Sequence, residues 1–258
     1  MLPVDNLGLK RRELSVNSYL MTDKGLSRNT NQDDVLSITK ENGDSLYVLC
    51  DGMGGHTGGS IACKKCINTF KRDFDKSKYE DVESAKEWLY KTVLKANKEI
   101  IQAGNKDSQL KGMGTTVVCL LVSENFKVYA SVGDSRLYSY NKKSLKQISE
   151  DQTFAAALYK AGYINKKEVE NHPRRGMLLC AVGTSPGSSL DVQIKEVKGN
   201  DNYLICSDGL YNMVEESKIK KILDEDISIK DKGEKLINEA NDNGGFDNIS
   251  VILLEASL

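Results

Sequence analysis

The stretch Asp51-Gly52-Met53-Gly54-Gly55-His56-Thr57-Gly58-Gly59 limits the possible folds of this chain more than any other part of it. An apolar run, residues 46–50, leads directly into this stretch, and a segment with helical spacing follows over residues 61–70. A buried strand, a glycine-dense loop and a helix are therefore predicted in succession. An Asp-Gly pair after a strand is typical of a hairpin turn. The further glycines indicate instead that another group approaches the main chain closely, either a phosphate or a metal site.

The remaining segments form blocks of strands separated by pairs of helices. Strand patterns lie at 15–22, 35–38, 46–50, 115–123, 126–132, 136–140, 190–197, 203–206 and 249–254, and helical patterns at 60–74, 82–103, 215–223 and 230–240. Such blocks predict an α+β fold in which two packed, mainly antiparallel β-sheets form a β-sandwich flanked by antiparallel helix pairs (α-β-β-α). We expect one domain over residues 1–258. A helical flap at about 150–188, with helices at 154–161 and 166–171, is expected to be part of it.

Charge and cysteine content exclude several classes of protein. Lys and Arg number 36 against 37 Asp and Glu, so no general attraction to nucleic acid is expected. No apolar stretch is long enough to span a membrane, and residues 1–14 lack the apolar core of a signal peptide, so a cytoplasmic protein is predicted. Of six cysteines, Cys63 and Cys66 form the only CxxC pair, for which core packing is a better interpretation than zinc binding.

Acidic residues recur at the ends of the predicted strands. They are Asp33, Asp51, Asp134, Asp208 and Asp247. Carboxylates at strand ends can converge on one rim of a sandwich, where a divalent cation would relieve their mutual repulsion. Because the chain has only two histidines, this oxygen-rich set favours Mg²⁺ or Mn²⁺ over zinc. Each acid alone is also typical of a turn, so spacing by itself leaves both interpretations open.

Six motifs in order carry a resemblance to a known family. They are Arg28-Asn29-Thr30-Asn31-Gln32-Asp33, Asp51-Gly52-Met53-Gly54-Gly55-His56, Gly114-Thr115-Thr116, Gly133-Asp134-Ser135-Arg136, Ser207-Asp208-Gly209 and Asp247-Asn248-Ile249-Ser250. With these motifs the chain resembles bacterial-type members of the PPM (PP2C-like) family of metal-dependent Ser/Thr protein phosphatases. The resemblance extends from about residue 16 to residue 254, and the two-sheet sandwich of that family agrees with the predicted fold.

The resemblance also implies roles for individual residues. The implied metal ligands are five carboxylates and one main-chain carbonyl: Asp33, Asp51, the carbonyl of Gly52, Asp134, Asp208 and Asp247. Asp51 would bridge two core cations, Mn²⁺ or Mg²⁺, and Asp134 would serve a third, weaker site. Asp33 would support a metal through water or as a neighbouring ligand. Arg28 would be the catalytic and substrate-binding residue that holds the phosphate.

The implied reaction is hydrolysis of phosphoserine and phosphothreonine in proteins by a water that bridges the two metals. The resemblance points to phosphoprotein substrates and to opposition to a bacterial Ser/Thr kinase. The sequence does not define the oligomeric state, for which a monomer is the favoured interpretation. Two other functions are kept as alternatives. A catalytically silent binding module would typically have lost a metal acid, and none is lost here. A hydrolase of small phosphoesters or nucleotides could share the same metal core, because that core recognises only phosphate.

Several residues depart from the family pattern. Met53 stands where animal-type relatives carry a histidine proposed as a general acid, and for the nearby His56 a structural role is favoured. Cys180 replaces an arginine common in bacterial relatives, and Gln152 replaces a histidine. In the flap, Arg174-Arg175 could contact a phosphopeptide, but a solvated surface pair is the favoured interpretation. These departures affect the flap and substrate choice rather than the metal core.

Overall fold

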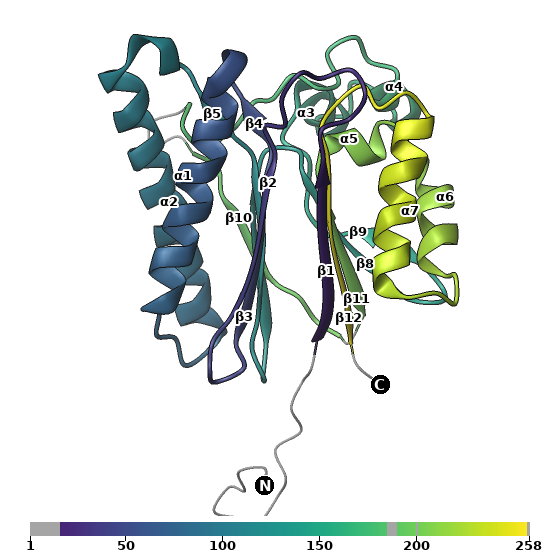
Figure 1. Cartoon of the computed structure of the whole chain (residues 1–258), viewed down its shortest axis with the longest axis horizontal. Helices are drawn as coiled ribbons and strands as arrows, with labels where there is room; N and C mark the ends of the chain where they lie inside the picture. The colour runs from purple at the N-terminus through teal and green to yellow at the C-terminus, as the bar shows by residue number, and fades with distance from the viewer. Residues whose placement is uncertain (1–15, 185–189, 200, 257–258) are drawn as a thin grey trace, which may run out of the picture.

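Two five-stranded sheets pack face to face, and a pair of helices covers the outer face of each (Figure 1). The computed structural model describes residues 16–184, 190–199 and 201–256. Within these residues every strand pair in the two sheets is antiparallel. The predicted α+β sandwich flanked by helix pairs is therefore confirmed.

Each sheet contains strands from both halves of the chain. The first sheet has the order β1 (Val16–Asp23), β12 (Ile249–Ala256), β11 (Asn202–Cys206), β8 (Arg136–Tyr140) and β9 (Leu145–Gln147). The second has the order β10 (Gln193–Glu196), β7 (Lys127–Val132), β6 (Val117–Val122), β3 (Ser45–Cys50) and β2 (Asp34–Thr39). A third, two-stranded sheet joins β4 (Gly52–Met53) to β5 (Gly114–Thr115) beside the glycine-rich stretch.

Three apolar layers hold the sandwich together. The inner faces of the two sheets meet in one layer, which includes Tyr47, Tyr129 and Ile252. The helices α1 (Gly55–Asp75) and α2 (Val82–Lys106) bury a second layer against the second sheet. The helices α6 (Glu216–Leu223) and α7 (Ile229–Asp242) bury a third layer against the first sheet. Both sheets are thus covered on both faces, which leaves mainly their strand ends for a functional site.

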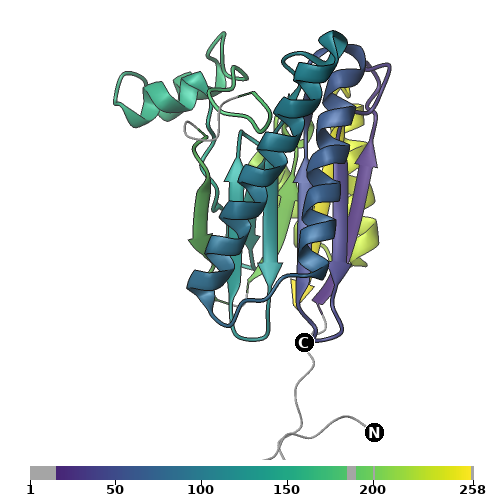
Figure 2. The same cartoon turned by 90° about the vertical axis from the view of Figure 1, so that its left-hand side faces the viewer.

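The flap segment lies at one end of the sandwich. It carries two short helices, α3 (Phe154–Lys160) and α4 (Lys166–Glu170), close to the predicted ranges. Figure 2 shows these helices standing off the sheets at the end opposite to the start of β1 and the end of β12. The structure also contains η1 (Ser108–Leu110) and the one-turn helix α5 (Asp208–Tyr211), neither of which was predicted, and α5 follows β11 at the same end.

The glycine-rich stretch differs from its prediction. Helix α1 begins at Gly55, five residues before the predicted start, so it includes glycines assigned to a loop. The turn into the helix uses Gly54 and Gly55, with φ of 112° and 66°, where other residues are strained. Gly59 allows close packing, because a Cβ there would lie 2.7 Å from the main-chain carbon of Gly52. The glycines therefore bring α1 against the strand that follows Asp51.

Substitution of Gly209, the residue after Asp208, tests how tightly the main chain is packed at the strand ends. A Cβ at this position would lie 2.0 Å from the main-chain oxygen of Asn248, which cannot move without shifting β12. We expect Gly209→Ala to lower the free energy of unfolding in urea by about 1–3 kcal/mol. Gly176→Ala is the control, because no atom lies within 4 Å of a Cβ there. Equal stability of the two variants would contradict this packing.

Candidate metal centre

A cleft of about 620 Å³ opens at the end of the sandwich that carries the flap. Six of the seven predicted site residues line it: Arg28, Asp51, Gly52, Asp134, Asp208 and Asp247. They are far apart in sequence, and each lies in a segment that follows or precedes a strand: β1, β3, β7, β11 or β12. The predicted convergence of strand-end acids on one rim is thus what the fold produces.

The seventh residue, Asp33, is buried and is not among the residues that line the cleft. Its Oδ2 accepts hydrogen bonds from the hydroxyls of Ser207 and Ser250, at 2.8 and 2.7 Å. Its Oδ1 is buried without a hydrogen-bond partner. A buried carboxylate oxygen left unpaired is costly, and a cation or water would satisfy it.

The acids are electrostatically strained because they are close together and poorly solvated. Burial, followed by the charges of Asp33, Asp208 and Asp134, raises the pKa of Asp51 well above its usual value. Burial is also the main cause that raises the pKa of Asp33 to about 7, of Asp134 to about 8 and of Asp208 to about 6. Like charges held this close favour the protonated forms unless a cation compensates them.

Two of the acids are held by neighbouring donors. Arg28, at the mouth of the cleft, donates from Nη2 to Asp247 Oδ2 at 2.7 Å, and this hydrogen bond raises the pKa of Arg28. Asn212 Nδ2 donates to Asp208 Oδ2 at 3.0 Å. In the part of the chain that the structure describes, no three His, Cys, Asp or Glu side chains already form a closed ligand set. The all-oxygen donors nevertheless fit Mn²⁺ or Mg²⁺, once Arg28 releases Asp247.

The main chain at Asp51 is fixed by the Gly114-Thr115-Thr116 motif. The amide of Thr116 donates to the carbonyl of Asp51 at 2.8 Å, and the amide of Asp51 donates to Thr116 Oγ1 at 3.1 Å. The hydroxyl of Thr115 donates to the same carbonyl at 3.0 Å. Thr115, at the end of β5, and Thr116, which follows it, thus hold the main chain of Asp51 in place, a role that the sequence did not indicate.

Asn248 is a second residue whose role sequence reasoning missed. Its side-chain amide donates to the carbonyls of Lys24 and Thr30, at 2.8 and 3.0 Å, and its Oδ1 accepts from the amide of Gln32 at 2.9 Å. The loop that carries Arg28 is therefore fastened to the residue that follows Asp247. The signal was present, because Asn248 belongs to the Asp247-Asn248-Ile249-Ser250 motif.

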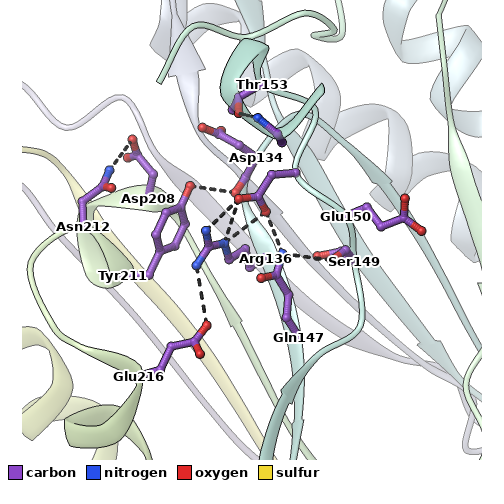
Figure 3. A network of polar contacts seen from close by, with 12 residues as sticks. Asp134, Arg136, Gln147, Ser149, Glu150, Thr153, Asp208, Tyr211, Asn212 and Glu216 are labelled. Atoms are coloured by element: carbon purple, nitrogen blue, oxygen red, sulfur yellow. Dashed lines mark hydrogen bonds and ion pairs between the residues drawn. The ribbon is translucent and has the colours of Figure 1, made fainter. Parts of the chain in front are cut away.

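A partly buried polar network lies next to Asp134 (Figure 3). Arg136 forms an ion pair with Asp151 through Nη2 at 2.7 Å and Nε at 3.0 Å. The guanidinium of Arg136 stacks on the ring of Tyr211, 3.5 Å from its centre. The hydroxyl of Tyr211 in turn donates to the main-chain carbonyl of Asp134 at 2.9 Å. The turn that carries Asp134 is thus supported from behind.

The residues that depart from the family pattern lie in different places. Met53 lines the cleft, whereas the side chain of His56 lies outside the described residues. Cys180 is buried. Neither arginine of the flap is among the described residues that line the cleft; the Arg174 guanidinium lies 5.7 Å from the centre of the Phe154 ring. The favoured surface interpretation of this pair stays a prediction.

Within the described residues, no helix is long and apolar enough to cross a membrane.

The raised pKa values predict how pH changes the stability of the metal-free protein. The native state holds protons on Asp33, Asp134 and Asp208 up to pH of about 6 to 8, whereas an unfolded aspartate loses its proton near pH 4. The native state therefore binds more protons in this window, so its stability is greatest below about pH 4 for these groups and falls as pH rises to about 8.

We expect Asp134→Asn to reduce this loss of stability. The measurement is the free energy of unfolding in urea with a chelator present, from pH 5 to pH 9. Asp226→Asn, at an exposed acid, is the control and should leave the pH dependence as in the original protein. An Asp134→Asn variant with the same pH dependence as the original protein would contradict the strain assigned to this carboxylate.

The sequence of this chain is similar to those of known phosphatases. The family model for protein phosphatase 2C matches residues 25–243. The serine/threonine phosphatase stp of Listeria monocytogenes is 34% identical over 241 residues, which cover 92% of this chain and 94% of that protein. Protein phosphatase PhpP of Streptococcus pneumoniae is 34% identical over 235 residues, covering 91% of this chain and 95% of that protein.

Solved structures of serine/threonine phosphatases have the same fold as this chain. The crystal structure of the serine/threonine phosphatase Stp1 from Staphylococcus aureus superposes with a TM-score of 0.88 at 34% identity, covering 96% of this chain and 98% of that one. The catalytic domain of the serine/threonine protein phosphatase PstP, solved with two manganese ions, superposes with a TM-score of 0.80 at 28% identity, covering 94% and 99%. The chain belongs to the bacterial-type protein phosphatase 2C (PPM) family of serine/threonine phosphatases.

Proposed function

We propose that this protein hydrolyses phosphoserine and phosphothreonine in phosphoproteins, with Mn²⁺ or Mg²⁺ as cofactor. The observation that carries the proposal is the convergence of Asp51, Asp134, Asp208 and Asp247 on one cleft with Arg28 at its mouth. Family membership narrows the chemistry to phosphate ester hydrolysis. The PstP catalytic domain was solved in complex with two manganese ions, which supports a metal-dependent reaction for the present protein.

The proposed ligands follow from the position of each oxygen. Asp51 with the Gly52 carbonyl, and Asp208 with Asp247, would hold two core cations, and Asp134 would contribute to a third site. When bound, the cations neutralise the crowded carboxylates and lower the pKa of a water so that it can attack phosphorus. Asp33 is held by hydrogen bonds from Ser207 and Ser250. Its unpaired Oδ1 would bind a metal-bound water or a cation from the buried side of the site.

Arg28 is proposed to bind the substrate phosphate. Its side chain is 55% exposed at the mouth of the cleft, so an incoming phosphate reaches it without a change in the fold. The planar guanidinium can donate two parallel hydrogen bonds to phosphate oxygens. Exchange of Asp247 for phosphate at Arg28 would also free an Asp247 oxygen to bind metal. Phosphate binding at Arg28 would then favour metal binding at Asp247, and metal binding at Asp247 would favour phosphate binding at Arg28.

Met53 bears on the second half of the reaction. It lines the cleft but has no proton to donate to the leaving seryl or threonyl oxygen. Water in the open cleft is therefore the proposed proton source. Opposition to a bacterial Ser/Thr kinase, a cytoplasmic location and a monomeric state are further parts of the proposal, and they rest on the sequence and on the family.

Substitution of Arg28 tests the proposed phosphate contact. We expect Arg28→Ala to lower kcat/KM for a phosphothreonine peptide by about 10- to 100-fold, the loss typical of a hydrogen bond to a charged group. Arg28→Lys should retain part of the activity, because it keeps the charge but not the paired donors. The assay follows phosphate release at saturating Mn²⁺. An unchanged kcat/KM in Arg28→Ala would contradict the assignment.

Two controls define the reaction class. Asp208→Asn should abolish Mn²⁺-dependent hydrolysis, because it removes a charged metal ligand.

A panel of nucleotides and small phosphoesters, assayed beside phosphoserine and phosphothreonine peptides, tests the substrate class. A higher kcat/KM for nucleotides than for the peptides would overturn the proposed substrate.

A further inference from the structure

We propose that Tyr211 is a positioning residue that fixes Asp134 relative to Asp208, and that Arg136 holds the Tyr211 ring in place for this task. The inference rests on the proposed function, because it takes Asp134 and Asp208 as metal ligands. It adds a residue outside the acids and Arg28, one that is not among the described residues that line the cleft.

The geometry places Tyr211 between the two acids. Asp208 and Tyr211 are the first and last residues of α5, so one helical turn joins them rigidly. The Tyr211 hydroxyl donates to the main-chain carbonyl of Asp134 at 2.9 Å. In Figure 3 the Tyr211 side chain extends from α5 across to the turn that carries Asp134. The tyrosine thus sets the separation between the helix of one acid and the turn of the other.

The ring of Tyr211 has little freedom to move. The Arg136 guanidinium lies 3.5 Å from the ring centre, a stacked cation–π contact. Arg136 is itself held by the two-point ion pair with Asp151 and donates to the Tyr138 hydroxyl at 2.8 Å. Its side chain is only 18% exposed, so water does not weaken these contacts as it does at a surface. A ring held this firmly can act as a fixed spacer.

A second contact fixes the same turn from the flap side. The amide of Gly133 donates to Gln152 Oε1 at 2.8 Å, and the amide of Gln152 donates to the carbonyl of Gly133 at 3.0 Å. The side-chain amide of Gln152 also donates to the main-chain carbonyl of Asp191 at 2.9 Å. The main-chain carbonyl of Gln152 accepts a hydrogen bond from the amide of Leu179. Gln152 anchors the start of the turn to the flap, while Tyr211 anchors Asp134 itself to α5.

This support is needed because the two acids repel each other. Asp134 is buried and lines the same cleft as Asp208, so water screens the repulsion between the two carboxylates poorly. Without a fixed spacer the turn could relax and move the carboxylates apart. A cation that draws on Asp134 would then bind less tightly, since ligand groups held in place lose less freedom on binding.

Tyr211→Phe isolates the hydroxyl, because phenylalanine keeps the ring on Arg136. We expect Mn²⁺ binding, measured by calorimetry on the full chain, to weaken about tenfold at its weakest resolved step, as for loss of a group that orients a metal ligand. The Mn²⁺ concentration for half-maximal peptide hydrolysis should rise by the same factor. Tyr140→Phe is the matched control: it also removes a tyrosine hydroxyl that donates one hydrogen bond, but to Glu255 and not to Asp134.

Combination with Asp134→Asn decides whether Tyr211 acts through Asp134. In that background, Tyr211→Phe should have no further effect on Mn²⁺ affinity. Equal Mn²⁺ affinities of Tyr211→Phe and Tyr140→Phe would overturn the inference, as would a full tenfold loss that persists in the Asp134→Asn background. Failure of the original protein to bind Mn²⁺ or to hydrolyse the peptide would instead overturn the proposed function, so the two failures are distinguishable.

Discussion

Repulsion between buried carboxylates is the constraint on which this end of the molecule depends. Asp33, Asp51, Asp134 and Asp208 all have pKa values raised first by burial, and the charges of neighbouring acids add to the effect. A protein that needed only stability would not gather acids in this way. Cations at this cleft would supply the missing positive charge, and the ion pair between Arg28 and Asp247 supplies part of it.

The fold holds these acids together by attaching their loops to one another. Hydrogen bonds from Thr116 and Thr115 fix the main chain of Asp51, Asn248 fastens the loop of Arg28, and Tyr211 reaches the carbonyl of Asp134. The two sheets and their helices provide the rigid frame from which these loops project. A site on a rigid frame needs little rearrangement when metal or phosphate binds, which favours both affinity and rate.

Much of this arrangement could be predicted from the sequence, for reasons that individual residues make clear. Apolar runs bounded by turn residues predicted the long strands. The positions of Asp51, Asp134, Asp208 and Asp247 at strand ends, together with the family resemblance, predicted their convergence on one rim. The start of α1 was predicted too late, because glycines disfavour helices unless close packing requires them, as it does at Gly59. Helix α5 has a single turn, which is too short to produce a helical pattern in the sequence. The hydrogen bond from Tyr211 to Asp134 joins residues far apart in the chain, so no local pattern could indicate it.

The most direct test of a metal centre at this cleft is a crystal structure of the protein grown with Mn²⁺, with anomalous diffraction recorded at the manganese absorption edge. The account predicts at least two anomalous peaks in the cleft, in contact with the carboxylates of Asp51, Asp208 and Asp247, and an Arg28 that has released Asp247. Peaks confined to other parts of the surface, with the ion pair between Arg28 and Asp247 intact, would contradict it.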